Sequence, residues 1–213
     1  MGVKKIIKKI SFWICKKTNI ILGFFRKKRL NNTDFTIISN NCWGGKVYEY
    51  FNLPKNSPTV GMYFFAEEYI KFVYGLQHYL QQRLEIIDFS QSKYKQQLIE
   101  RNQTNCLIGK IDDVEIVLLH FHSVKEAKEK WERRCKRVNY DNLIYKLSEM
   151  DYCTEKHLKD FDALPAKKKI TFVCKDYKLQ SQIVCSEWTK YGRVKNDTKK
   201  FKKHINLVKL INR

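Results

Sequence analysis

The chain has 213 residues, with 42 Lys/Arg against 22 Asp/Glu and a formal net charge of +20. Residues 1–30 hold ten bases and no acid, and residues 190–213 hold nine bases and one acid, which leaves residues 31–189 nearly neutral. This distribution argues against a nucleic-acid-binding core, so no nucleic-acid partner is expected. It indicates an anionic surface that the two ends contact.

The first segment, residues 1–32, is basic and amphipathic. Apolar residues recur at helical spacing with lysines between them, which favours a helix lying on anionic lipid. A helix packed on the domain is the alternative. No run reaches the roughly 18–20 apolar residues that span a bilayer, and no signal-peptide cleavage site is evident. We therefore expect a cytoplasmic protein that is peripheral on the inner membrane.

Strands and helices are expected to alternate through residues 33–190. The predicted strands are 35–39, 59–64, 84–87, 106–111, 114–121, 142–147, 169–174 and 182–187, and the predicted helices are 46–52, 66–82, 93–101, 124–136 and 154–161. Asp112 and Asp113 suggest a β-hairpin between two of these strands. The pattern predicts an α/β domain with three layers, a mainly parallel sheet with helices on both faces, and one antiparallel hairpin. Residues 191–213 are expected to form a basic C-terminal segment with a helix at 199–211.

Seven cysteines occur, an odd number without any C-x-x-C pair. They favour a reduced, intracellular protein with buried thiols over a disulfide framework or a zinc site. No metal site and no cofactor are predicted.

The first candidate site follows the first predicted strand, at the run Asn40-Asn41-Cys42-Trp43-Gly44-Gly45. Glycines allow the backbone to approach a ligand closely, and a following helix directs its N–H groups at an anion. A helix N-terminus also favours a cysteine thiolate at Cys42. The alternative is a plain strand-to-helix connection with a buried Cys and Trp.

Two imidazoles, His120 and His122, lie on one face of a predicted strand. One of them paired with Cys42 would suit nucleophilic catalysis, with Asp141 orienting the base. A pair of structural histidines is the alternative reading.

A second polar patch runs from Trp131 to Asn142. Arg133 and Arg134 suit a phosphate, because a guanidinium binds two oxygens. Trp131 would stack on a sugar or base, and Asn139 and Asn142 would hold sugar hydroxyls. The alternative is a solvated, charged helix end.

Three stretches carry a resemblance to a known family: SNNCWGGKVYEYFNLPKNSPTVGMYF, LLHFHSVKEAKEKWERRCKRVNYDNL and FDALPAKKKITF. Together they resemble the bacterial domain-of-unknown-function family 1919 over about residues 33–190. Members are often labelled exopolysaccharide biosynthesis proteins, so the resemblance implies an α/β domain and a link to cell-surface polysaccharide. It implies no reaction.

The functional expectation combines these readings. We expect a transferase of surface polysaccharide assembly that acts on a phosphate-linked sugar at the inner membrane face. The alternative is a non-catalytic module that docks on the membrane or on a partner of the assembly system. No P-loop, G-x-G-x-x-G or D-x-D motif appears to decide between them.

Overall fold

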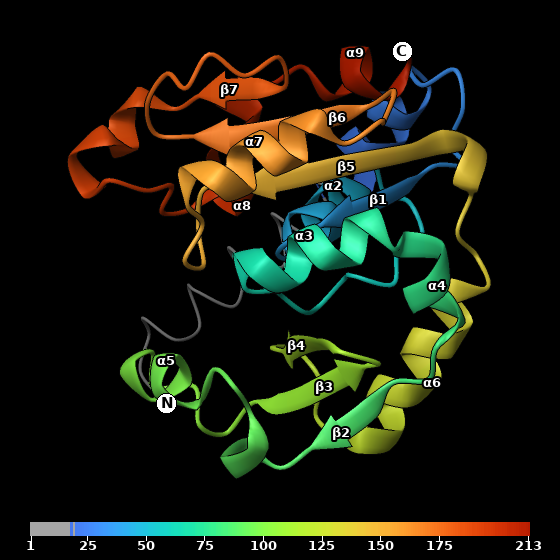
Figure 1. Cartoon of the computed structure of the whole chain (residues 1–213). Coiled ribbons are helices and arrows are strands. Elements are labelled where there is room, and N and C mark those ends of the chain that lie inside the picture. Colours follow the sequence, from blue (N-terminus) through green and yellow to red (C-terminus); the bar gives the residue numbers. More distant parts are fainter. Residues whose placement is uncertain (1–17, 19) are drawn as a thin grey trace, which may run out of the picture.

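The computed structural model describes residue 18 and residues 20–213 (Figure 1). The amphipathic helix predicted at the N-terminus lies mostly outside these residues, whose first helical stretch ends at residue 27. Within the described part of the chain, no helix is both long enough and apolar enough to cross a membrane.

Four parallel strands form the larger sheet, in the order β1-β5-β6-β7. Their bounds are β1 (Thr36–Ser39), β5 (Leu143–Ser148), β6 (Lys169–Val173) and β7 (Gln182–Val184). β1 and β5 are neighbours although about a hundred residues separate them, and Ile37 pairs with Ile144. The carboxyl ends of these two strands therefore meet at one edge of the sheet.

A smaller antiparallel sheet lies below the parallel one in Figure 1, in the order β2-β3-β4. Its strands are β2 (Glu85–Ile87), β3 (Leu107–Ile111) and β4 (Val114–Leu118). The hairpin predicted at Asp112 and Asp113 is present, with Asp112 in the left-handed region at a φ of 55°. The hairpin builds this separate sheet and does not extend the parallel one.

Helices connect and cover the strands. They include α2 (Trp43–Tyr50), α3 (Ala66–Tyr74), α4 (Leu76–Gln81), α5 (Lys95–Glu100), α6 (Val124–Cys135), α7 (Glu155–Ala163), α8 (Asp197–Lys200) and α9 (Leu207–Ile211). Figure 1 shows α6 running from the smaller sheet back to β5 of the larger one. The backbone N–H of Thr154 donates to Nδ1 of His157 and caps the start of α7.

Successive residues of a strand point to opposite sides of the sheet. In this sheet both sides are covered. Ile37 and Ile144 lie in the core beneath α2 and the C-terminal segment. Ile38 and Leu147 lie in the core beneath α3 and α7. The predicted α/β class, with a mainly parallel sheet and helices on both faces, is confirmed.

Three predicted elements differ from the structure. Residues 59–61 form a turn in which Gly61 has a φ of 91°, and residues 62–64 belong to no strand, although Tyr63 makes an isolated bridge to Val117. The helix predicted at 66–82 is divided at Gly75 into α3 and α4. The basic helix predicted at 199–211 consists of α8, a 3-10 turn and α9.

The C-terminal segment packs into the same core as the sheet. Phe201, Leu207, Leu210 and Ile211 are buried against the α2 side of the core. The ring of Phe201 lies 5.9 Å from that of Trp43. Residues 191–213 are thus one of the covering layers of the α/β domain.

Candidate functional site

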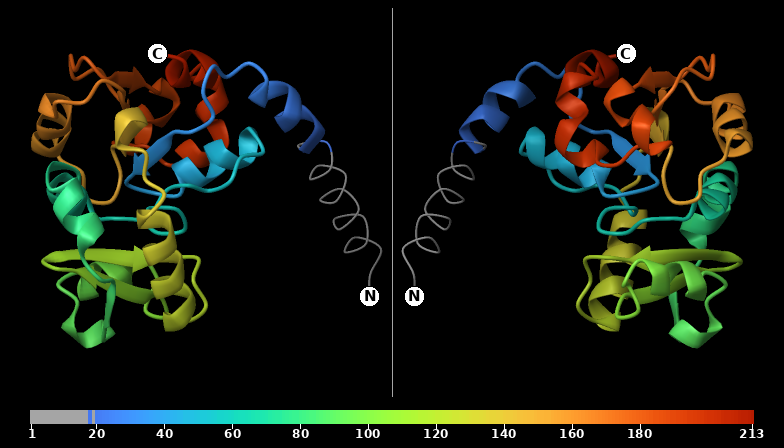
Figure 2. Two further views of the ribbon diagram at one scale, coloured as in Figure 1. Left: turned by 90° about the vertical axis from the view of Figure 1, so that its right-hand side faces the viewer. Right: turned by 90° about the vertical axis from the view of Figure 1, so that its left-hand side faces the viewer.

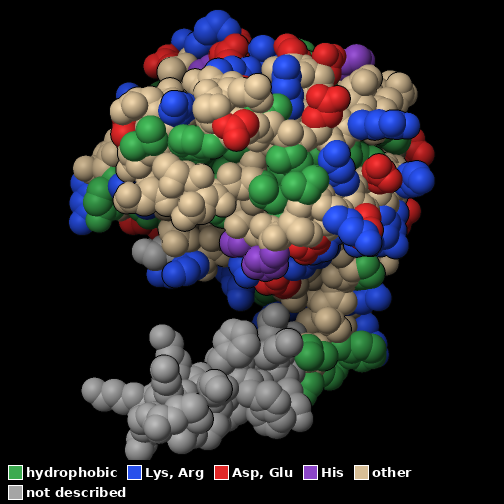
Figure 3. Space-filling view, turned by 90° about the horizontal axis from the view of Figure 1, so that it is seen from below, with side chains coloured by type: hydrophobic (Ala, Val, Ile, Leu, Met, Phe, Trp, Pro, Cys, Tyr) green, Lys and Arg blue, Asp and Glu red, His purple; other side chains and the backbone are tan. Residues whose placement is uncertain are grey.

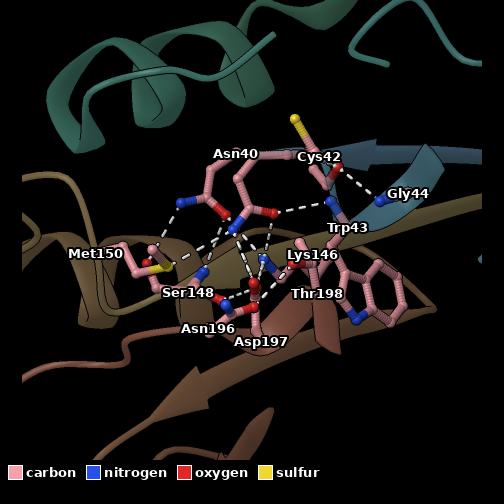
Figure 4. Close-up of polar contacts among 12 residues, drawn as sticks. Asn40, Cys42, Trp43, Gly44, Lys146, Ser148, Met150, Asn196, Asp197 and Thr198 are labelled. Atoms are coloured by element: carbon pink, nitrogen blue, oxygen red, sulfur yellow. Dashed lines mark hydrogen bonds and ion pairs between the residues drawn. The ribbon is translucent and has the colours of Figure 1, made fainter. Parts of the chain in front are cut away.

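Polar side chains gather where β1 and β5 end. Asn40 and Asn41 follow β1, and Lys146 and Ser148 lie at the carboxyl end of β5. Asp197, from the start of α8, reaches the same place (Figure 4). In open parallel sheets, ligands bind beyond the carboxyl ends of the strands. A ligand site is therefore expected at this edge of the sheet.

Lys146 and Asp197 form a buried ion pair at the centre of this group. The ammonium of Lys146 also donates to the side-chain oxygens of Asn41, at 2.9 Å, and Asn40, at 3.2 Å. The Asp197 carboxylate accepts from Ser148 Oγ at 2.6 Å and from Asn41 Nδ2 at 3.0 Å. Each charge is thus satisfied by hydrogen bonds, as a buried pair requires.

Burial and ion pairing have opposite effects on the pKa values of Lys146 and Asp197. Burial lowers the pKa of Lys146, and the attraction of Asp197 only partly offsets it. Burial opposes ionisation of Asp197, but Lys146 and the hydrogen bonds from Ser148 and Asn41 together hold its pKa below the ordinary value. The carboxylate therefore stays ionised at neutral pH.

Cys42 lies directly before α2, beside this cluster. Its thiol points away from Lys146 and Asp197 (Figure 4), and Sγ lies 3.9 Å from the carbonyl oxygen of Met62. Burial, followed by the negative charge of Asp197, raises the pKa of the Cys42 thiol. This is opposite to the direction expected for a cysteine at a helix N-terminus, so Cys42 is a neutral thiol at pH 7.

Two cavities meet at Cys42. The larger holds about 400 Å³, and its charged or titratable lining includes Cys42, Lys46, Arg101, His120, Asp151 and Asp197. The smaller holds about 260 Å³, and its lining includes Cys42, Gly45, Lys46, His120, Lys130 and Arg134. Cys42, Lys46 and His120 are common to both. We call the two cavities together the Cys42 pocket.

Five of the residues predicted from the sequence line this pocket: Asn41, Cys42, Gly45, His120 and Arg134. His120 is exposed, and its backbone N–H donates to the carbonyl of Gly61 at 3.0 Å. Arg134 is nearly buried and donates through Nη1 to the carbonyl of Val60 at 2.7 Å. Burial and the neighbouring Arg133 lower the pKa of Arg134.

Cations outnumber carboxylates around the smaller cavity. Lys46 and Lys55 both pair with Glu49, at 2.8 and 2.9 Å. Lys130 pairs with Glu126, whereas Arg134 bonds to a backbone carbonyl. The wall therefore favours an anionic ligand.

The two glycines are needed for packing. Both lie in the first turn of α2 and are buried. A Cβ at Gly44 would lie 3.1 Å from Cγ2 of Ile37, and one at Gly45 would lie 3.1 Å from Cγ1 of Val60. The amide of Gly44 points to Ser39 Oγ, at 3.3 Å. This pair lets α2 lie close to β1; the Gly44 amide is bonded to Ser39, and Gly45 lines the smaller cavity.

The two tryptophans are core residues and not stacking platforms. Trp43 is fully buried against Phe172 and Phe201. Trp131 is also buried, and its Nε1 donates to the carbonyl of Gln82 at 3.1 Å. Neither side chain lines the Cys42 pocket.

Two further predicted residues lie near the pocket but outside its lining. His122 is exposed, and its backbone N–H donates to Glu126 at 2.9 Å. Arg133 is exposed on α6. The strand predicted to carry both histidines ends at Leu118, so His120 and His122 lie in the loop after β4 and do not share a strand face, and only His120 lines the pocket. Among the described residues, no group of three His, Cys, Asp or Glu side chains has a geometry that holds a metal ion.

Asp141, Asn139 and Asn142 lie at the opposite edge of the sheet. They precede β5, whereas the pocket adjoins its end. Asn139 Nδ2 donates to the carboxylate of Asp34 at 3.0 Å, and Asn142 Nδ2 donates to the Asp34 carbonyl at 2.9 Å. These amides hold the entry of β1 to the entry of β5. The prediction that Asp141 orients a base beside Cys42 is wrong.

Asp151 and Arg101 were not anticipated from the sequence. Arg101 Nη1 donates to Asp151 Oδ1 at 2.6 Å, while burial raises the pKa of Asp151. Asp151 and Tyr152 both have positive φ, at 55° and 62°. Such strain costs about 1–3 kcal/mol per residue and concentrates at functional sites.

Lys146 does leave a signal in the sequence, because it interrupts an apolar strand that is covered on both faces. The role of Asp197 leaves no such signal, since its partner Lys146 lies 51 positions earlier in the sequence.

Two comparisons bear on the identity of the chain. The family described as "Domain of unknown function (DUF1919)" matches residues 14–212. An uncharacterized protein from Haemophilus influenzae is 32% identical over 169 residues, which cover 79% of this chain and 76% of that relative. The match extends beyond residues 33–190, so it includes the C-terminal segment that carries Asp197.

Proposed function

The chain belongs to the DUF1919 family of unknown function, and from this premise we propose a transferase of cell-surface polysaccharide assembly. Its substrate is a phosphate-linked sugar, bound in the Cys42 pocket. The observation that carries the proposal is the cationic wall of this pocket at the carboxyl edge of a parallel sheet.

Recognition of the donor begins with its phosphate. Arg134 and Lys46 line the smaller cavity and bind the phosphate oxygens. The larger cavity, which adjoins it, has room for the sugar and the acceptor. A partly enclosed site strengthens these contacts, because water screens them less.

The transfer step uses His120. An acceptor hydroxyl attacks the anomeric carbon, the bond from that carbon to the phosphate oxygen breaks, and the phosphate leaves with the electron pair. His120 lines both cavities and accepts the hydroxyl proton. Cys42, a neutral thiol, forms part of the wall and does not attack.

Two further observations support the sugar substrate and the membrane location in this proposal. The family resemblance links members to exopolysaccharide biosynthesis, and the chain carries its excess of Lys and Arg at its two ends. These ends hold the protein at the inner membrane face. A lipid-phosphate-linked or nucleotide-linked sugar would both be accessible there.

Calorimetric titration with a panel of nucleotide sugars and short-chain lipid-phosphate-linked sugars tests the pocket. Arg134→Gln should weaken binding by about tenfold or more, because it removes a charged partner of the phosphate. Arg133→Gln is the matched control, since Arg133 is the adjacent exposed arginine outside the pocket. Equal loss in the two variants, or no binding by any sugar of the panel, would refute the proposal.

A non-catalytic docking module is the second candidate. It is favoured by the raised pKa of Cys42 and by the position of Asp141 at the far edge. Polysaccharide output in cells separates the two. His120→Ala abolishes output if the protein is the transferase and leaves it unchanged if the protein only docks.

A further inference from the structure

The helix at residues 20–27 is attached to the domain through its small and basic face. Gly23 lies so close to the residues that follow α2 that an added Cβ would be 2.7 Å from Cβ of Asn52. Arg26 donates to the carbonyl of Tyr50 at 3.2 Å, and its guanidinium lies 4.0 Å from the centre of the Tyr50 ring. These contacts fix which side of the helix faces the domain.

The opposite side of this helix is apolar. Ile20, Ile21, Phe24 and Phe25 are 48, 60, 53 and 60% exposed. At about 100° per residue they share an arc of about 140° on the side away from Gly23. A helix of a soluble domain normally turns such a stripe inward. Figure 3 shows a hydrophobic patch where the described residues meet the grey ones.

Figure 2 shows this helix and the C-terminal segment at the same end of the molecule. A cationic cavity is lined by Arg29, which follows the helix, and by residues of the C-terminal segment. It holds about 380 Å³, and its wall includes Arg29, Tyr50, Lys202 and Lys203. Lys202 Nζ lies 4.8 Å from the Tyr50 ring, which Arg26 also contacts. Of the described residues that line it, none is Asp or Glu.

The positive charges of Arg29, Lys202 and Lys203 around this cavity favour an anionic ligand. Burial and the nearby Arg26 both lower the pKa of Lys202, which means that two like charges are held together. An acidic protein surface would neutralise them but would leave the apolar face of the helix in water. A bilayer offers both partners at once, since its phosphates lie directly above its acyl chains.

We propose that this surface docks on an anionic bilayer: Ile20, Ile21, Phe24 and Phe25 enter the acyl layer, and the cavity of Arg29, Lys202 and Lys203 binds a lipid phosphate. The inference rests on the membrane part of the proposed function and is independent of the Cys42 pocket. It adds the C-terminal segment as the element that binds the headgroup. It also fixes the orientation of the domain on the membrane.

Sedimentation of the full chain with vesicles tests the surface. Vesicles containing phosphatidylglycerol should bind the protein, and vesicles of phosphatidylcholine alone should bind it at least about tenfold more weakly. Phe24→Ser with Phe25→Ser should reduce binding strongly. Lys202→Glu with Lys203→Glu should weaken it by about tenfold or more, because each lysine near the surface contributes.

The matched control is Lys125→Glu with Lys128→Glu, which makes the same charge change at exposed positions of α6. This control should retain binding to within about threefold, and Arg134→Gln should bind vesicles like the wild type. Equal loss in the two lysine pairs, or unchanged binding after the phenylalanine substitutions, would overturn the inference. Both outcomes leave the sugar titration above unaffected, so the two proposals fail separately.

Discussion

The ammonium group of Lys146 lies against the carboxylate of Asp197, 51 positions further along the chain, and water reaches neither side chain. Lys146 belongs to the parallel sheet, whereas Asp197 belongs to the segment that covers it. The ion pair therefore holds a strand and a covering layer together at the edge that forms the Cys42 pocket.

Removing one partner should be costly. Asp197→Asn leaves the buried ammonium of Lys146 without a counter-charge, so we expect the free energy of unfolding to fall by about 3–5 kcal/mol. Urea unfolding followed by circular dichroism measures the loss. Asp176→Asn is the control, because Asp176 pairs with Lys178 on the exposed surface and should change stability little. A similar small effect for both variants would show that the buried pair does not stabilise the fold.

Replacing both partners should be much milder. The double variant Lys146→Met with Asp197→Leu puts apolar groups of similar volume in place of the charges, and it should recover most of the lost stability. If the double variant is as unstable as Asp197→Asn, the hydrogen bonds that the pair makes with Asn40, Asn41 and Ser148 matter more than the charges.

The contribution of Asp197 to stability should depend on pH. Its pKa is lowered in the folded state, so its contribution is complete above the unfolded value of about 3.9 and is lost as pH falls through the folded value. The gap in stability between wild type and Asp197→Asn should therefore narrow below about pH 4. Urea unfolding at a series of pH values measures it.

The contribution of Asp151 to stability should change with pH in the opposite direction. Burial raises its pKa in the folded state, so its favourable contribution is present at low pH and is lost as pH rises through the folded value. Relative to wild type, Asp151→Asn should gain stability as pH rises above about 4. A constant difference across this range would contradict the raised pKa.

The thiol of Cys42 should react slowly at neutral pH. An ordinary thiol has a pKa of about 8.5, and burial and Asp197 raise that of Cys42. Alkylation by iodoacetamide, followed at Cys42 by mass spectrometry, should accelerate at a higher pH in the folded protein than in urea. The same cysteine in urea should follow an ordinary thiol, which serves as the control. Rapid reaction of the folded protein at pH 7 would point to a thiolate and a nucleophile.

Substitution of Gly45 tests whether this glycine is needed for packing. Gly45→Ala brings a methyl group to 3.1 Å from Val60, and overpacking of this kind costs about 1–3 kcal/mol. Adding Val60→Ala should restore part of the stability by making room. Thermal unfolding of the two single variants and the double variant measures the coupling. Additive losses would mean that Val60 is not the obstacle.

The parallel sheet was predictable because its strands are short apolar runs between helices, as in Ile37-Ile38 and Leu143 to Leu147. The residues at the carboxyl edge of β1 were predictable for the same reason, since a strand that ends in Asn40 and Asn41 delivers them there. Local pattern and topology agree at this edge.

The remaining parts depend on contacts that local pattern does not record. The amides of Asn139 and Asn142 look like ligand groups, but they bond to Asp34, over a hundred residues earlier. The glycines at 44 and 45 look like a phosphate turn, but their neighbours Ile37 and Val60 come from other segments. Asp197 is found only once the C-terminal segment is folded against the sheet.

The dependence of Lys146 on Asp197 has a consequence for biosynthesis. A nascent chain emerges in sequence order, so all four strands of the parallel sheet, through Val184, are made before the residue that neutralises Lys146. Until then the finished strands would bury an uncompensated ammonium if they closed. The sheet therefore completes its folding late, when the covering segment arrives, and a ribosome stalled between residues 184 and 197 should hold an open, protease-sensitive intermediate.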